Sequence, residues 1–107
     1  MTFAFPKPSP HRDARYLAFI RNHPCCACEA INEGQKTRTE CAHTGRHALG
    51  SKADDYRAIP LCEKHHRSDS HGLDKRGRWW FEESYGLVID DVVMDLLIER
   101  IAGGNYA

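Results

Sequence analysis

The sequence has no long apolar run and no apolar segment behind a basic start, so neither a membrane span nor a secretion signal is expected. It also has no internal repeats and no low-complexity segment. A chain of 107 residues of this kind is expected to form one domain with a modest core. We therefore expect a cytoplasmic protein that does not enter a membrane.

The number of cysteines is not even. The five cysteines are an odd number, which argues against a framework built only of disulfides. Small domains often need another staple, and thiolates in a reducing compartment can bind zinc. The composition therefore favours a structural metal.

The chain has no excess of charge of either sign, because its net charge is zero. The distribution is uneven: residues 36–78 carry 10 Lys and Arg against 6 Asp and Glu, whereas residues 79–107 carry 1 against 6. The basic section overlaps residues 40–72, which hold five of the seven histidines. This is a weak electrostatic signal for a phosphate backbone, placed beside candidate metal ligands and proton-transfer groups.

Two short motifs predict a zinc site. Cys25 and Cys28 form a CxxC pair, and Cys62 and His65 form a CxxH pair, so the four can surround one tetrahedral ion. The alternative is four unrelated side chains, since free cysteine also serves as a small core residue. Cys26 is adjacent to Cys25 and competes with it as the ligand.

Local patterns predict a small α+β fold. Residues 1–11 read as an extended, proline-rich arm and 12–107 as one domain. Asp13 is a candidate cap for a helix to residue 22. Strands are expected at 40–43 and 58–61, the second confined to a sheet edge by Pro60, and a helix at 62–70.

Two further helices are expected near the C-terminus. One covers residues 79–85 and stops at Gly86, with aromatic side chains that either fix it to the core or stack on bases. The other starts at Asp90 or Asp91 as its cap. Its apolar face is either core or a dimer seam and comprises Val93, Leu96, Leu97 and Ile101.

The order of these motifs resembles the HNH nucleases of the ββα-metal type, in particular the phage and prophage branch that includes the RecA-dependent HNH nuclease. The likeness covers about residues 25–86, and its most specific part is GSKADDYRAIPLCEKHHRSDSHG. It implies a zinc-stapled ββα core with flanking helices that clasps one catalytic divalent ion. The implied activity is hydrolysis of DNA phosphodiester bonds.

The resemblance also assigns roles to single residues. His43 matches the general base that activates water, and His66 matches the final histidine, a ligand of the catalytic Mg, Mn, Ni or Zn ion. Asp55 matches an acidic residue that orients the base or helps to hold the metal. Lys52 or Arg57 would hold the scissile phosphate, unless Lys52 is only a solvated loop charge.

Two departures from the family pattern affect the catalytic site. Arg57 occupies the place of the usual middle asparagine, and Ala42 that of a second metal ligand. His71, His47 or Asp55 must then replace this ligand, and we favour His71.

Two rival interpretations remain open. In the first, the chain is a non-catalytic zinc-stapled module that binds DNA or protein, and His43 is an ordinary polar residue beside the zinc. In the second, it is a nuclease subunit that needs a recombinase filament or a phage protein to present its substrate. The near-neutral net charge favours the second only slightly.

Overall fold

The computed structural model describes residues 11–45 and 53–103 and has an α+β architecture. Lys52, His47 and residues 1–10 of the predicted arm lie outside the described residues. No helix within the described part is both long and apolar enough to cross a membrane. The elements in chain order are α1 (Ala14–Arg21), α2 (Cys26–Ile31), β1 (Glu40–His43), the 3₁₀ turn η1 (Asp55–Arg57), β2 (Ala58–Leu61), α3 (Glu63–Arg67), α4 (Leu73–Arg76), α5 (Arg78–Tyr85) and α6 (Ile89–Ala102).

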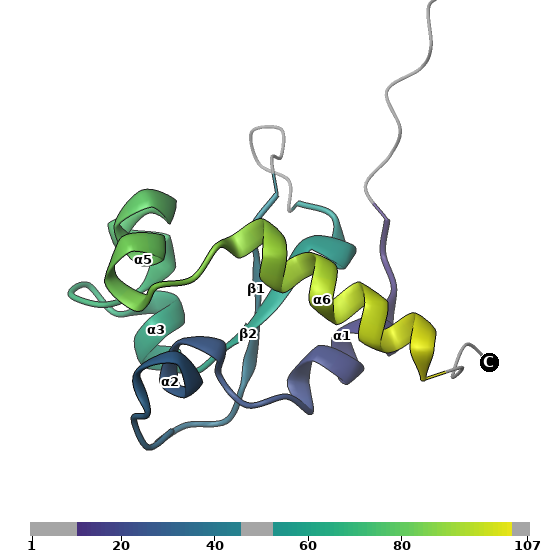
Figure 1. The fold of residues 1–107 in the computed structure, drawn as a ribbon, viewed down its shortest axis with the longest axis horizontal. Helices are drawn as coiled ribbons and strands as arrows, with labels where there is room; N and C mark the ends of the chain where they lie inside the picture. The colour runs from purple at the N-terminus through teal and green to yellow at the C-terminus, as the bar shows by residue number, and fades with distance from the viewer. Residues whose placement is uncertain (1–10, 46–52, 104–107) are drawn as a thin grey trace, which may run out of the picture.

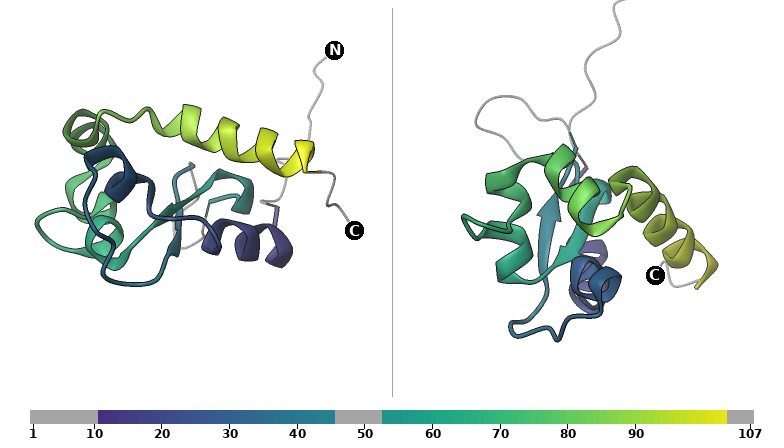
Figure 2. Two further views of the ribbon diagram at one scale, coloured as in Figure 1. Left: turned by 60° about the horizontal axis from the view of Figure 1, so that its bottom comes forward. Right: turned by 60° about the vertical axis from the view of Figure 1, so that its left-hand side comes forward.

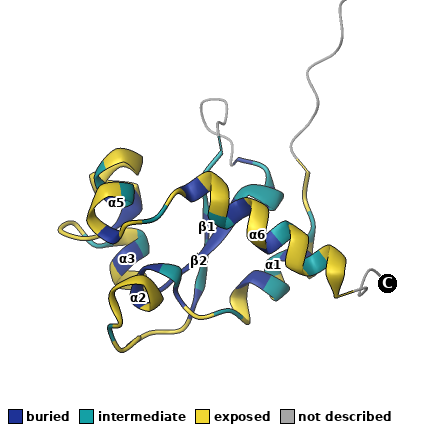
Figure 3. Ribbon diagram, viewed as in Figure 1, coloured by how far each residue is buried: buried dark blue, intermediate teal, exposed yellow. Residues whose placement is uncertain are grey.

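The centre of the fold is an antiparallel pair of strands, β1 and β2, and both have the predicted bounds. Glu40 lies opposite Leu61, and His43 opposite Ala58. Pro60 is tolerated because each strand of a two-stranded sheet has a free edge that requires no donor. All four residues of β2 are buried, so this strand is the central element on which the helices pack (Figure 3).

The helices cover the strand pair from two sides. Figure 1 and Figure 2 show α1 and α6 on one side of the strands, and α3 and α5 on the other. Helix α1 and helix α3 each contact both strands, while α6 and α2 pack on β2. The largest fully buried core residues are Tyr16, Phe81, Ile20, Ile59, Leu61 and Ile89.

The start of the first helix and the end of the fifth helix lie where the sequence predicted. Asp13 caps α1, because its Oδ1 accepts a hydrogen bond from the Tyr16 N–H at 3.0 Å. Gly86 ends α5 in the left-handed conformation, with φ 64°. Both signals are local, so the surrounding fold did not change them.

The predicted helix over residues 62–70 is shorter than expected. Helix α3 ends at Arg67, because Ser68 turns to an extended backbone and its Oγ donates to the Lys64 carbonyl at 2.6 Å. A tight loop then brings Gly72 so close to Ser68 that a Cβ atom there would lie 2.6 Å from the Ser68 backbone. The short helix α4 follows this loop and was not predicted.

Helix α2, which begins at the CxxC segment, was also not predicted. Cys25 is the N-cap of this helix, and its Sγ accepts from the Cys28 N–H at 3.5 Å. The helix ends at Asn32, which adopts a left-handed conformation with φ 53°. The cysteine pair therefore lies at a helix start, where the thiol replaces the usual capping oxygen.

The predicted start of the last helix is wrong. Val88, not Asp90 or Asp91, is the N-cap of α6, and the Ile89 N–H is bound instead by Glu82 Oε2 at 2.7 Å. A side chain of the preceding helix thus performs the capping. Asp90 pairs with Arg57 and Arg78 instead.

The apolar faces predicted for the last two helices are buried only in part. Phe81 and Tyr85 hold α5 to the core, and Val93 and Leu96 do so for α6. Trp79 is 83% exposed and Ile101 63% exposed, so neither belongs to the core. The alternatives for these faces, stacking on bases and a dimer seam, stay predictions.

Candidate metal centre and histidine sites

The predicted Cys3His group is formed in the structure. The starts of α2 and α3 bring Cys25, Cys28, Cys62 and His65 together, with their ligand atoms within 4.8 Å of one another. His65 Nδ1 lies 3.6, 3.4 and 3.3 Å from the Sγ atoms of Cys25, Cys28 and Cys62. The Cys28 and Cys62 sulfurs are 3.8 Å apart.

These distances match a tetrahedral zinc ion. Zinc–sulfur bonds of about 2.3 Å and zinc–nitrogen bonds of about 2.0 Å place two tetrahedral sulfurs ~3.8 Å apart and a sulfur and a nitrogen ~3.5 Å apart. All four residues are buried. Burial raises the pKa of the Cys25 and Cys28 thiols and lowers that of His65, so the protein alone does not favour thiolates there. The group could hold a metal such as zinc, whose charge would offset this cost.

Glu33 joins this centre from the loop after α2. Its Oε2 lies 3.3 Å from His65 Nε2, the nitrogen that faces away from the sulfurs. Its other oxygen accepts from Lys64 Nζ at 2.8 Å, and this hydrogen bond lowers the pKa of Glu33. The Glu33 oxygen and His65 Nε2 make no hydrogen bond within the described residues, so the carboxylate is an electrostatic neighbour of the imidazole. Sequence spacing gave no signal for this residue.

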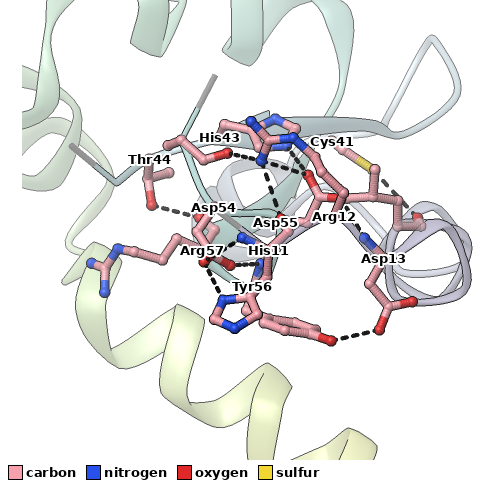
Figure 4. Close-up of polar contacts among 12 residues, drawn as sticks. His11, Arg12, Asp13, Cys41, His43, Thr44, Asp54, Asp55, Tyr56 and Arg57 are labelled. Carbon is pink, nitrogen blue, oxygen red and sulfur yellow. Dashed lines mark hydrogen bonds and ion pairs between the residues drawn. The ribbon is translucent and has the colours of Figure 1, made fainter. Parts of the chain in front are cut away.

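A second site lies at the end of β1. His43 Nε2 lies 2.8 Å from Asp55 Oδ1, and both side chains are largely buried, at 15% and 5% exposure. Figure 4 shows Asp55 directed at the His43 ring from the turn η1. Because an ionised carboxylate only accepts, this contact puts the proton on Nε2 and leaves Nδ1 as an acceptor. None of the hydrogen bonds made within the described residues reaches His43 Nδ1.

Asp55 is itself fixed by the segment before α1. Its Oδ2 accepts from the Asp13 N–H at 2.7 Å, and its own N–H donates to the His11 carbonyl at 3.1 Å. The Arg12 guanidinium lies 3.6 Å from Oδ1. The neighbouring Asp54 instead binds His11 and the Tyr56 N–H (Figure 4). Of the two adjacent aspartates, the structure thus directs only Asp55 at His43.

His66 lies between two carboxylates. Its Nδ1 is 2.8 Å from Glu40 Oε1, and its Nε2 is 3.3 Å from Asp74 Oδ2. Arg67 also binds Glu40 with two nitrogens, which lowers the pKa of this carboxyl group. The two ring nitrogens face different ways, so the carboxylates do not converge on one point.

His43 and His66 belong to different faces of the strand pair. Alternation along β1 places Glu40 and Ala42 on the face that His66 approaches, and Cys41 and His43 on the other. The Cys41 thiol accordingly contacts the Leu17 carbonyl of α1 at 3.3 Å.

His71, the favoured second ligand, forms no group of three or more metal-binding side chains with His66 within the described residues. It is exposed, and its Nδ1 lies 2.6 Å from Ser70 Oγ. The Cys3His group is the only set of three or more clustered metal-binding side chains found within residues 11–45 and 53–103. Arg57 is paired with Asp90.

A family model described as "Protein of unknown function (DUF968)" matches residues 1–101, which include every residue of these sites. Neither a curated protein nor a solved structure matches the chain. These comparisons assign no activity to the side chains of the two sites.

Proposed function

Because the chain belongs to the DUF968 family, whose description names no activity, we propose a function from its own sites: a metal-dependent endonuclease of the HNH type that hydrolyses phosphodiester bonds of DNA. The proposal rests on the sequence resemblance and on one observation, the His43–Asp55 contact at the end of β1. The order β1, β2, α3, with α3 in contact with both strands, agrees with a ββα-metal unit.

His43 would act as the general base. Nδ1 would take a proton from the attacking water, while Asp55 accepts the Nε2–H and stabilises the imidazolium that forms. The Asp13 N–H and the Arg12 guanidinium keep Asp55 in place for this role. A positioned general base of this kind accelerates the reaction by about 10²–10⁴-fold.

A divalent ion would supply charge stabilisation for the phosphorane and the leaving oxygen. His66 is its proposed ligand, and the oxygens of Glu40 and Asp74 beside the ring are donors of the type that Mg and Mn prefer. His66 approaches the other face of the strand pair from His43, so the pairing of this ligand with that base rests on the sequence resemblance alone. The paired Arg57 leaves Lys52 as the proposed phosphate contact, and Lys52 lies outside the described residues.

The test compares the two adjacent aspartates. Plasmid and single-stranded DNA are incubated with Mg, Mn, Ni or Zn and wild type, His43→Ala, Asp55→Asn or the matched control Asp54→Asn. We expect His43→Ala to lose about 10²–10⁴ in cutting rate. Asp55→Asn should also be slow, and Asp54→Asn should cut like wild type. Equal cutting by wild type and His43→Ala would refute the assignment of the base.

His66→Ala should fail in a different way. Removing a ligand lowers affinity for the ion, so high Mn or Mg should restore part of the cutting. Removing the base leaves the ion in place, so no metal concentration should rescue His43→Ala. If the two variants respond alike to added metal, the division of roles between base and ligand is wrong.

The rival function is a non-catalytic zinc-stapled module that binds DNA or protein. It is favoured by one observation: His66 is held by Glu40 and Asp74, and no second ligand cluster is formed within the described residues. This module would bind its partner without cutting DNA in any of the four metals. Wild-type protein free of cutting activity, with full zinc content, would support it over the nuclease.

A further inference from the structure

A cavity of about 460 Å³ lies between α1, η1 and the last turns of α6. Its volume falls in the range of about 300–1,000 Å³ that is typical of small-ligand sites. The lining residues are of three kinds: aromatic (Tyr16 and Tyr56), cationic (Arg15 and Arg100) and aliphatic (Leu97 and Ile101), with Asp13 at the edge. Aromatic walls beside arginines are the combination that binds single nucleotides of a strand.

Tyr16 contributes its ring to the wall of this cavity. Its side chain is only 2% exposed, and its hydroxyl oxygen is closed to solvent and has no hydrogen-bond partner within the described residues. Burial raises the pKa of Tyr16 to about 12, so the phenol remains protonated. A ligand in the cavity would therefore meet the ring of Tyr16 and not its hydroxyl.

The Arg15 guanidinium is exposed and makes no hydrogen bond or ion pair within the described residues. The Asp13 carboxylate also lines the cavity, and the hydrogen bonds from Tyr56 and the Tyr16 N–H lower its pKa, so it keeps its negative charge. Arg100 lies over the Phe19 ring at 5.4 Å. The two arginines outnumber the single carboxylate, so the lining carries a net positive charge that suits a phosphate.

Asp13 connects this cavity to the catalytic candidates. Its N–H binds Asp55, and its side chain accepts from the Tyr56 hydroxyl at 2.7 Å. Figure 4 shows Tyr56 next to this aspartate, with Asp55 between Tyr56 and His43 in the view. A nucleotide held against Tyr56 would lie on the α1 side of the strands, on the same side as His43.

We propose that this cavity binds one nucleotide, with its phosphate on Arg15 and its base between Tyr56 and the aliphatic residues of α6. This inference rests on the proposed nuclease function. In the nuclease, the cavity would hold an unpaired nucleotide of the DNA strand that is cut. The same chemistry would accept a free mononucleotide, and the experiment separates the two sources.

The test measures binding of a fluorescein-labelled single-stranded oligonucleotide over a range of salt, without added divalent metal and without chelator. The variants are Arg15→Ala and Tyr16→Phe, with Arg38→Ala as the control for loss of one exposed arginine elsewhere. Arg15→Ala should reduce the slope of log affinity against log salt by about 0.7, the value of one phosphate contact on a single strand. Arg38→Ala should leave the slope at the wild-type value.

Tyr16→Phe is a second control and should leave the affinity at the wild-type value, because its hydroxyl is closed to a ligand in the cavity. Its melting temperature without ligand should equal or exceed that of wild type, because the hydroxyl has no partner within the described residues. NMR titration with dAMP and dTMP provides the second arm, and the signals of Leu97 and Ile101 should shift.

The outcomes separate this proposal from the nuclease itself. If Arg15→Ala binds with wild-type affinity and slope while cutting depends on His43, the cavity proposal is refuted and the nuclease proposal stands. If mononucleotides shift the NMR signals of Leu97 but no DNA is cut, the cavity proposal stands and the nuclease proposal is refuted. The ligand would then be a free nucleotide. If neither nucleotides nor the oligonucleotide shift these signals, the cavity assignment is wrong.

Discussion

At the residue scale, both ring nitrogens of His65 have close polar neighbours, although Nε2 makes no hydrogen bond within the described residues. Nδ1 faces the three sulfurs, and Nε2 lies 3.3 Å from a Glu33 oxygen. Histidines that bind a metal commonly donate their other N–H to a carboxylate, which fixes the ring and makes it a stronger ligand. The Lys64 contact keeps Glu33 ionised, because it lowers the pKa of this carboxyl group.

We therefore predict that Glu33→Ala weakens zinc binding without removing a ligand. The loss of affinity should be about 10- to 100-fold, as for other carboxylates behind a ligating histidine. Competition with a chromophoric chelator measures it. Glu29→Ala is the matched control, since this exposed glutamate of α2 is absent from the metal centre. Equal zinc affinity of the two variants would contradict the role of Glu33.

At the scale of elements, the connection from α5 to α6 shows how two helices determine each other's ends. Gly86 takes the left-handed conformation that ends α5, and Glu82 of the same helix binds the first N–H of α6. Asp90, no longer needed as a cap, binds Arg57 and Arg78. The direction of α6 over β2 thus depends on a short connection with a defined backbone.

Gly86→Ala should destabilise the protein by about 1–2 kcal/mol, because a side chain disfavours the left-handed backbone. No atom lies within 4 Å of the added Cβ, so the effect comes from the backbone conformation alone. Gly34→Ala is the control: space is also open there, and its φ lies outside the left-handed range. Urea unfolding measures both free energies, and Gly34→Ala should be neutral or slightly stabilising.

At the scale of the whole molecule, the metal centre connects segments that are distant in sequence. Its cysteines come from the start of α2 and the start of α3, on either side of the strand pair in the chain. The core cluster contains the same cysteines beside the apolar residues of α1, α5 and α6. Structural zinc sites of this type contribute about 10–16 kcal/mol of apparent binding free energy, which becomes folding free energy in small domains.

We predict that the protein carries about one tightly bound zinc per chain and unfolds when it is removed. Chelation should abolish the cooperative thermal transition seen by circular dichroism, and Cys62→Ser should unfold or aggregate. Cys26→Ser and Cys41→Ser are the controls, because neither thiol belongs to the cluster, and both should retain zinc by metal analysis. A folded, zinc-free wild type, or loss of zinc from Cys26→Ser, would show that the ligand set is wrong.

The sequence by itself determined the features that depend on neighbours in the chain. The CxxC and CxxH spacings identified the Cys3His group that the structure assembles. The cap at Asp13, the stop at Gly86 and the bounds of both strands were also predicted correctly. Each is a local preference of the backbone or a short spacing, and packing elsewhere did not override it.

Only the tertiary structure decided which side chains meet across the fold. Glu33 reaches His65, Glu40 and Asp74 enclose His66, and Glu82 replaces the predicted aspartate caps of α6. Asp55, rather than the adjacent Asp54, faces His43 because the backbone of Asp13 holds its other oxygen. These partners come from separate segments, and no spacing in the chain encodes their distance. Packing on the strand pair brings them together, so the chemistry of the histidines is set by the fold.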